Sequence, residues 1–390
     1  MKHKTDVLGQ RFTLSKAIDF MRGANARVFL GTYTQEKGIE HSAIKIMRTD
    51  SSDPQSRKYI QIFQTELLIL TTLKDTPGIS SPRDCGLIKF DNIHNMDDDV
   101  TVEGQTGEVI HMGPDGLLEL HEKLNNDNLD DWLPFLSIEL RSQNLEICFD
   151  RIIRDRNGSV DSFLMPVPSA IETSYQLVRI LASAHSNKII YADTKPVHFY
   201  WHYNNRDPQQ IYVIDWNCSQ ILPKDNLAYY QLDLKELVAN IIFPLFTGRI
   251  LAGSRSNKGS TPSEVEHQLN TEYKIGEWKK EEKKRLDKEI MRLLEDTIVK
   301  RTVLSAALFL ERLDIIRESW ASGEKNKDFL RAINHINLSY YHLEQSRLHL
   351  TELAEGFAQN NFREARNEAR RLNEFAKDVL SLWGLTREDN

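Results

Sequence analysis

Near the start of the chain, apolar and polar positions alternate with a period of two, which is typical of strands. The alternation runs through MRGANARVFLGTY and HSAIKIMR, and QEKG between them indicates a turn, so the sequence predicts an antiparallel sheet within about residues 12–46. In KYIQIFQTELLILTTL, apolar residues recur at spacings of three and four, which predicts a helix with one apolar face. Pro77 and Gly78 are expected to end this helix.

Glu66 lies on the apolar face of that helix, although it carries a charge. A buried carboxylate without a cation costs several kcal/mol, so Glu66 either reaches solvent at the edge of the face or pairs with Lys45 in AIKIM. A lysine beside a turn of small residues, such as Gly23 and Ala26, can also balance the charge of a phosphate. A plain hairpin with a solvated lysine is the alternative.

The rest of the chain first turns acidic and then becomes helical. Residues 90–131 contain NMDDDVTVEGQTGE and NNDNLDDW, which indicate an acidic, turn-rich insertion. LEICFDRII and SFLMPV predict strands that are joined by a hairpin turn at RDRNGS. SYQLVRILASAH and LDLKELVANIIFPLFTG predict helices, and residues 328–382 predict an amphipathic helical hairpin with its turn at QNN. The pattern therefore predicts the α+β class, and the terminal hairpin either packs against the rest or binds a protein partner.

Composition and charge narrow the class of protein. With 390 residues the chain exceeds the usual size of one hydrophobic core, so we expect one two-lobed domain with an appendage, or two to three domains. The net charge of −7 argues against a nucleic-acid partner held by overall basicity. Cys85, Cys148 and Cys218 form no C-x-x-C pair, which predicts a reducing, cytoplasmic setting without disulfides or zinc. No apolar run is long enough for a membrane span.

The stretch IIYADTKPVHFYWHYNNRDPQQIYVIDWNCS contains two aspartates, Asp193 and Asp215, that each follow a short apolar run. Aspartates in such places are often only turn formers that bond to nearby backbone N–H groups. Here IIYADTKPVHFYW and IYVIDWNCS together resemble the catalytic loop and the metal-binding motif of the protein-kinase superfamily, H-R-D-L-x-x-x-N and D-F-G. The resemblance implies that Asp193 is the catalytic aspartate, that Lys195 contacts phosphate as in serine/threonine-type loops, and that Asp215 binds magnesium.

The resemblance extends towards the N-terminus in the superfamily's order. Gly23, Ala26 and Val28 match three positions of the glycine-rich loop G-x-G-x-x-G-x-V, and the resemblance implies that they bind nucleotide. AIKIM matches V-A-I-K, which implies that Lys45 contacts the phosphates and that Glu66 is its partner on the following helix.

Together the motifs cover about residues 12–320 and imply a bilobal protein-kinase-like fold. Its sheet-containing N-lobe would span residues 1–165, with the acidic insertion at about 90–131, its helical C-lobe would span 166–322, and the helical extension would span 323–390. Asp233 matches the aspartate that begins the central C-lobe helix, and Arg301 matches a structural arginine. ATP would lie between the lobes against a hinge near Met165 to Val167, with Mg²⁺ or Mn²⁺ as cofactor.

The chain also departs from the superfamily pattern. His198 replaces the loop asparagine, so it is either a packed histidine at the start of a strand, which we favour, or a metal ligand beside Asp215; a neutral imidazole suits transition metals better than magnesium. Tyr191 and Ala192 replace the His-Arg pair, and Asn217 replaces the glycine of D-F-G. No A-P-E motif follows, so the platform that docks a peptide is expected to be reduced.

Two functions stay open at this point. The retained charged residues imply a phosphotransferase that moves the γ-phosphate of ATP to a protein hydroxyl, with Asp193 as base and Asp215 as magnesium ligand. The departures instead favour a pseudokinase, which acts as a nucleotide-binding switch or as a scaffold for protein interactions. A protein partner would bind through the C-terminal helices or the acidic insertion.

Overall fold

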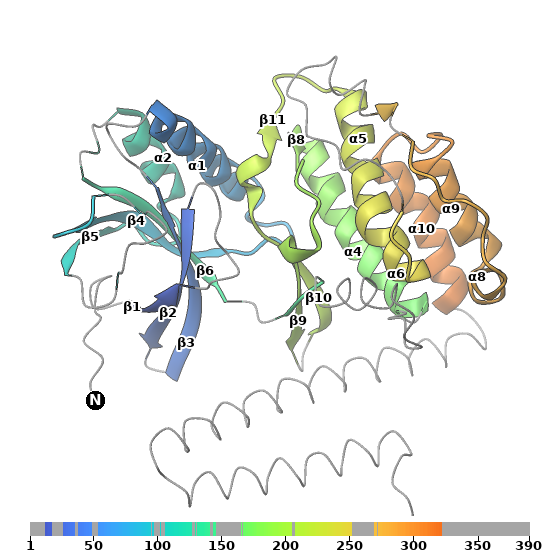
Figure 1. Cartoon of the computed structure of the whole chain (residues 1–390), viewed down its shortest axis with the longest axis horizontal. Coiled ribbons are helices and arrows are strands. Elements are labelled where there is room, and N and C mark those ends of the chain that lie inside the picture. The colour runs from blue at the N-terminus through green and yellow to red at the C-terminus, as the bar shows by residue number, and fades with distance from the viewer. Residues whose placement is uncertain are drawn as a thin grey trace, which may run out of the picture. The chain divides into compact units, whose positions relative to one another are not determined.

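A computed structural model of the chain describes residues 12–17, 26–35, 38–48, 54–94, 96, 102, 106–126, 129, 131–140, 143–145, 165, 167–204, 207–251, 269–270 and 272–321 (Figure 1). The chain divides into two compact units, and the first, Met1–His202 with Gln210–Arg317, contains the site described below. The glycine at position 23, the predicted turn RDRNGS and the predicted C-terminal hairpin lie outside the described residues. Among the helices that the structure describes, none combines the length and apolar character that a membrane span requires.

Six strands form one antiparallel sheet in the order β1-β2-β3-β6-β4-β5. They are β1 (Phe12–Ala17), β2 (Ala26–Gln35), β3 (Gly38–Met47), β4 (Pro82–Phe90), β5 (Gly107–His111) and β6 (Leu133–Glu139). The hairpin predicted from the alternating pattern is confirmed, because β2 pairs with β3 along its whole length. Since β3 also pairs with β6, Val28, Lys45 and Leu136 lie opposite one another on adjacent strands.

Alternate residues of these strands build the two faces of the sheet. One face belongs to a hydrophobic core that includes Phe29, Ile44, Ile46, Ile88 and Phe135. Residues of the opposite parity, among them Val28, Lys45 and Leu136, line a cavity on the other face. Lys45 can therefore reach the cavity although its two neighbours in β3, Ile44 and Ile46, are fully buried.

Strand β6 lies in WLPFLSIEL, where the sequence analysis predicts no strand, and it is central in the sheet. A proline has no N–H for a ladder and is unusual in a central strand. The register explains why Pro134 is tolerated: pairing with β3 runs from Ser42 opposite Glu139 to Ile46 opposite Phe135, and Pro134 lies just beyond its end.

Helix α1 (Pro54–Thr72) confirms the predicted amphipathic helix, and its buried face includes Phe63, Leu67 and Leu70. A second helix, α2 (Leu117–Asn126), packs against it, and Gln64 Nε2 donates to Asn125 Oδ1 at 2.9 Å. The region predicted as an acidic insertion thus contains strand β5 and helix α2. The helix forms there because leucines 117, 120 and 124 recur at helical spacing and are buried.

The second part of the chain is mainly helical, which confirms the α+β class. Its helices are α4 (Val167–Ser186), α5 (Leu227–Leu237), α6 (Phe243–Thr247), α8 (Lys280–Arg285), α9 (Lys288–Ile298) and α10 (Ala306–Ala321). A short π-helix, η4 (Val238–Ile242), joins α5 to α6, so the predicted apolar helix is continuous through LDLKELVANIIFPLFT. Pro244 lacks the N–H that an α-helix would use here, and the N–H of Phe243 bonds to Val238 instead.

Short elements place the two motif aspartates near each other. Asp193 follows β8 (Ile189–Ile190) and precedes the 3₁₀ turn η2 (Pro196–His198). Asp215 follows β10 (Asp207–Val213), which forms a three-stranded sheet with β9 (Phe199–Asn204) and β7 (Gln143–Asn144), and it precedes the 3₁₀ turn η3 (Trp216–Cys218). Strand β11 (Gln220–Ile221) then pairs with β8, so the Asp193 loop (residues 191–195) and the Asp215 segment (residues 214–219) meet at this small ladder.

Candidate functional site

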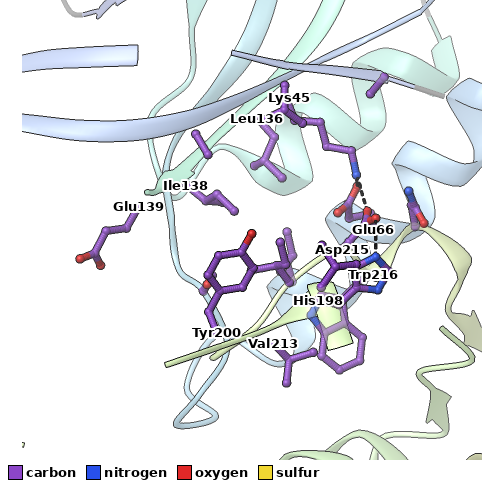
Figure 2. Close-up of a pocket in the computed structure, with 18 of the residues that line it drawn as sticks. Lys45, Glu66, Leu136, Ile138, Glu139, His198, Tyr200, Val213, Asp215 and Trp216 are labelled. Carbon is purple, nitrogen blue, oxygen red and sulfur yellow. Dashed lines mark hydrogen bonds and ion pairs between the residues drawn. The ribbon is translucent and has the colours of Figure 1, made fainter. Parts of the chain in front are cut away.

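A cavity of about 360 Å³ lies between the sheet and the β9–β10 region (Figure 2). This size falls in the range of roughly 300–1,000 Å³ that is usual for small-molecule sites. Much of the wall is apolar and comes from Ala26, Val28, Ala43, Leu136, Ile138 and Val213. At one end of the cavity the side chains are charged or ionisable, and they include Lys45, Glu66, His198 and Asp215.

Lys45 is the centre of this charged end. Its Nζ lies 2.8 Å from Glu66 Oε2 and 2.9 Å from Asp215 Oδ1, so one ammonium group bridges two carboxylates (Figure 2). Burial lowers the pKa of Lys45, but Asp215 and Glu66 outweigh this effect and raise the pKa above its ordinary value. The side chain of Glu66 is only 4% exposed, and the lysine is the cation that its place on the apolar face of α1 requires.

Asp215 faces the cavity with a side chain that is 29% exposed. Burial raises the pKa of Asp215, but Lys45 and His198 lower it more, so the pKa lies below its ordinary value and the carboxylate is ionised at neutral pH. The backbone of Asp215 is left-handed, with φ of 61°, a region that aspartate tolerates better than most residues. Trp216 anchors the turn that follows, because it is buried and packs edge-on against Tyr191 with ring centroids 4.8 Å apart.

Asp193 is buried and bound by Lys195 through both carboxylate oxygens. Lys195 Nζ lies 3.0 Å from Oδ1 and 3.1 Å from Oδ2 of Asp193. Lys195 itself is 60% exposed and also lines the cavity, so this ion pair lies between the buried loop and the opening of the site. The arrangement holds the buried carboxylate in a defined orientation next to an exposed cation.

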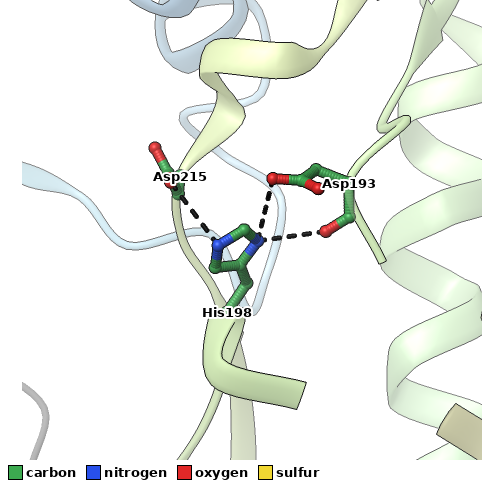
Figure 3. Close-up of side chains that lie close together, drawn as sticks. All are labelled: Asp193, His198 and Asp215. Carbon is green, nitrogen blue, oxygen red and sulfur yellow. Dashed lines mark hydrogen bonds and ion pairs between the residues drawn. The ribbon is translucent and has the colours of Figure 1, made fainter. Parts of the chain in front are cut away.

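His198 lies between Asp193 and Asp215 (Figure 3). Its Nδ1 is 3.0 Å from the backbone oxygen of Asp193, and because that oxygen only accepts, Nδ1 donates. Its Nε2 is 3.5 Å from Asp215 Oδ2. Burial lowers the pKa of His198 below its ordinary value of 6.5, although Asp215 and Asp193 raise it, so the ring is neutral at pH 7.

Asp233, in helix α5, binds the backbone of the Asp193 loop. Its carboxylate accepts from the backbone N–H of Tyr191 at 2.7 Å and of Ala192 at 2.9 Å, and His185 Nε2 lies 3.1 Å away. Ala192 has a left-handed φ of 55°, which is unfavourable for a residue with a Cβ. The buried carboxylate therefore stabilises a strained loop next to the ionisable side chains of the cavity.

The structure gathers most residues that the motifs single out. Those that line the cavity are Ala26, Val28, Lys45, Glu66, Lys195, His198, Asp215 and Asn217. Asp193 is joined to them through Lys195 and His198. Arg301 does not line this cavity, and its Nη1 donates to Asn270 Oδ1 at 3.3 Å. Gly23 lies outside the described residues.

The predicted hinge at Met165 and Val167 requires a correction. Neither residue lines the cavity: Val167 is the first residue of α4, and the backbone oxygen of Met165 accepts from Arg285 Nη1 at 3.0 Å. The wall at that side is formed instead by Ile138, Glu139 and Leu140, at the end of β6. The strands predicted at LEICFDRII and SFLMPV fall mainly on residues 146–164 and 166, which lie outside the described residues.

Sequence reasoning also missed Leu136, in β6, and Tyr200, in β9, which both line the cavity. Leu136 could have been found from the alternation in LPFLSIE, where Phe135 faces the core and Leu136 the cavity. Tyr200 has no comparable signal, because it lies in the run FYWHY, where several aromatic residues are adjacent.

No protein-family model matches this chain, and no curated protein matches it either.

Proposed function

We propose that the protein is a nucleotide-binding, protein-kinase-like phosphotransferase that moves the γ-phosphate of ATP to a protein hydroxyl. One observation carries the proposal: Lys45 is held between Glu66 and Asp215 at one end of an apolar-walled cavity, and the Asp193–Lys195 pair lies next to the same end. A charged amine, an ionised carboxylate and a carboxylate–lysine pair are the groups that phosphoryl transfer uses for positioning and charge stabilisation.

The fold supports the same proposal. An antiparallel sheet with one associated helix pair precedes a mainly helical part, as in a bilobal kinase-like fold with an N-lobe at 1–165 and a C-lobe at 166–322. Both parts contribute to the cavity. The extension at 323–390 would then be an addition to this fold.

The nucleotide would place its base against the apolar wall and its phosphates towards Lys45. Glu66 keeps the ammonium group oriented, so that the positive charge is fixed before the substrate arrives. Asp215 lines the cavity, with Oδ1 on Lys45 and Oδ2 facing His198, and would hold a divalent cation, Mg²⁺ or Mn²⁺. Such a cation neutralises phosphate charge when it is bound.

Asp193 would accept the proton of the acceptor hydroxyl, and Lys195 would offset the charge that develops on the transferred group. The Asp233 brace keeps Asp193 in place while Lys195 moves towards the phosphate. The protein thus contributes position and electrostatics, and each charged group should matter greatly.

A second candidate is a pseudokinase, a nucleotide-binding switch without transfer. A specific observation favours it: His198 Nε2 faces Asp215 at 3.5 Å, where the superfamily motif has an asparagine oxygen. A binding switch would keep Lys45 and Glu66 but would not need Asp193 as a base.

Incubation of the purified chain with labelled ATP and either Mg²⁺ or Mn²⁺ distinguishes the two candidates. Label transfer that Asp193→Ala and Asp215→Ala abolish, and that the exposed control Asp314→Ala retains, supports the phosphotransferase. Absence of transfer together with a nucleotide-induced rise in Tm that Lys45→Ala removes supports the switch. If ATP neither transfers label nor raises Tm, both candidates fail.

A cytoplasmic setting also belongs to the proposal. Cys85 is buried and carries a free thiol. A free thiol fits a reducing compartment, where ATP is also plentiful.

A further inference from the structure

We infer that His198 and Asp215 form a cation site with a nitrogen ligand, which selects a first-row transition-metal ion over Mg²⁺. This inference rests on the proposed function, because it names the cation that the nucleotide cavity would take. Of the two interpretations of His198, packing and metal ligation, it selects ligation. Its basis is the orientation of the imidazole ring between two acid-bearing segments (Figure 3).

The ring is oriented by a hydrogen bond on one side only. His198 Nδ1 donates to the backbone oxygen of Asp193 at 3.0 Å, which is the contact that fixes the tautomer of metal-binding histidines in many proteins. In the neutral ring the lone pair then lies on Nε2. That nitrogen points towards the cavity end where Asp215 is found.

The contact on the other side of the ring is too long for a charge-assisted hydrogen bond. Nε2 and Asp215 Oδ2 are 3.5 Å apart, whereas a protonated imidazole bonded to a carboxylate lies at roughly 2.7–2.9 Å. Two electron-pair donors therefore face each other across a gap. An ion that both can bind is the simplest species to occupy such a gap, and a merely packed histidine gives no reason for it.

The nitrogen site consists of His198 and Asp215. One ligand atom from each of Asp193, His198 and Asp215 lies within 4.8 Å of the others, but Asp193 Oδ2 approaches the ring on the Nδ1 side, at 3.6 Å, and not on the Nε2 side. Lys45 compensates one oxygen of Asp215 and Lys195 compensates Asp193, so the charge of the acids is partly balanced before a cation binds. A site of this kind is suited to a dication that gains from the nitrogen.

The ligand set determines the class of ion. Mg²⁺ prefers oxygen ligands only, while an imidazole strengthens binding in the order Mn²⁺, Co²⁺, Ni²⁺. Binding affinity should therefore rise from Mg²⁺ through Mn²⁺ to Co²⁺. In the variant His198→Asn, which replaces the nitrogen by an amide oxygen, this preference should shrink.

The test uses the full-length, metal-stripped chain without nucleotide. Calorimetric titration with Mg²⁺, Mn²⁺ and Co²⁺ gives the affinity order, and electron–nuclear double resonance on bound Mn²⁺ detects a ¹⁴N ligand. We expect a ¹⁴N coupling in the wild type and in the control His111→Asn, whose ring pairs with Asp84, and its loss in His198→Asn. The ratio of Co²⁺ to Mg²⁺ affinity should fall roughly tenfold or more in His198→Asn.

A wild-type protein that binds Mn²⁺ without ¹⁴N coupling overturns the inference, even if His198→Asn does not fold. An affinity ratio that His198→Asn leaves unchanged overturns it as well. Nucleotide binding, measured separately by the rise in Tm with ATP, distinguishes the two levels. Nitrogen ligation without nucleotide binding leaves the metal site standing and removes the proposed function, whereas ATP binding with Mg²⁺ and no nitrogen ligation removes this inference alone.

Discussion

Asp233 and Asp215 are the same residue type in two neighbouring regions, and their surroundings differ in every respect that matters. Asp233 is 3% exposed, and its oxygens accept two backbone N–H groups next to an imidazole. Asp215 is partly open to the cavity, with one oxygen on Lys45 and the other facing His198 across a gap. The first carboxylate is fully engaged within the fold, whereas the second lines the cavity, where the proposed function places a cation.

The comparison also shows how the second region depends on the first. Ala192 and Asp215 both have left-handed backbones, which cost of the order of 1–3 kcal/mol when the residue is not glycine. Asp233 fixes Ala192 through its N–H, and the Tyr191 hydroxyl donates to the backbone oxygen of Ile214 at 2.9 Å, next to Asp215. A hydrogen-bonded network thus maintains two strained residues next to the cavity.

The largest effect is expected for Asp233→Ala. Two buried backbone N–H groups lose a charged acceptor, so we expect the free energy of unfolding to fall by about 3–5 kcal/mol. Urea denaturation followed by circular dichroism measures the change. The control Asp314→Ala removes an aspartate that is 45% exposed and should change stability by less than about 1 kcal/mol. Equal effects of the two variants would contradict the assigned role of Asp233.

Lys45→Met should rank second, because it leaves the carboxylate of Glu66 buried without its cation. We expect a loss of about 2–3 kcal/mol, somewhat less than for a fully buried pair, since Lys45 remains 14% exposed. The double variant Lys45→Met with Glu66→Leu should recover part of this loss, because no uncompensated charge is left on the apolar face of α1. A double-mutant cycle by urea denaturation measures the coupling, and strictly additive losses would contradict the pairing.

Asp215→Asn should separate binding from folding. The amide oxygen still accepts from Lys45, and Glu66 still balances the lysine, so stability should change by about 1 kcal/mol or less. The rise in Tm caused by ATP with a divalent cation should be lost, because the anionic ligand is gone. Thermal denaturation with and without ligand measures both quantities, and a loss of stability as large as that of Asp233→Ala would remove the contrast between the two aspartates.

The smallest effect is a pH dependence from His198. Its pKa is lowered in the folded state, so the unfolded chain takes up this proton first as the pH falls through the ordinary value of 6.5. Stability should therefore decrease below that pH, and the decrease should be smaller in His198→Asn. Chemical denaturation at pH 5.5 and 7.5 with a chelator present measures the difference, which a histidine charged in the folded state would reverse in sign.

Much of this site could be predicted from the sequence because its groups lie in short local patterns. Lys45 on an alternating strand, Glu66 on an apolar helical face and an aspartate after each of two apolar runs need no knowledge of distant contacts. That these residues come together in one cavity depends on the tertiary structure. The local patterns do not predict it, and only the resemblance to the protein-kinase superfamily does. The orientation of His198 was not predictable, since it depends on a backbone oxygen of Asp193.

The fold was harder to predict in the described part of residues 90–140. There the acidic composition indicates a loop although α2 has three buried leucines, and Pro134 argues against a strand although β6 is central in the sheet. The residues expected at the hinge, Met165 and Val167, do not line the cavity, whose wall contains Ile138, Glu139 and Leu140. Tertiary pairing overrides local propensity in such segments.

The small ladder between β8 and β11 has a consequence for local opening. Ser219 Oγ donates to the backbone oxygen of Tyr191 at 2.7 Å, and the N–H of Leu222 bonds to Lys188 at the same distance. Hydrogen bonds therefore connect the chain around the Asp193 loop to the chain around the Asp215 segment on both sides of the pairing of Ile189 with Ile221. Their amide hydrogens should exchange with solvent as one cooperative unit, so the two acids are exposed together or not at all.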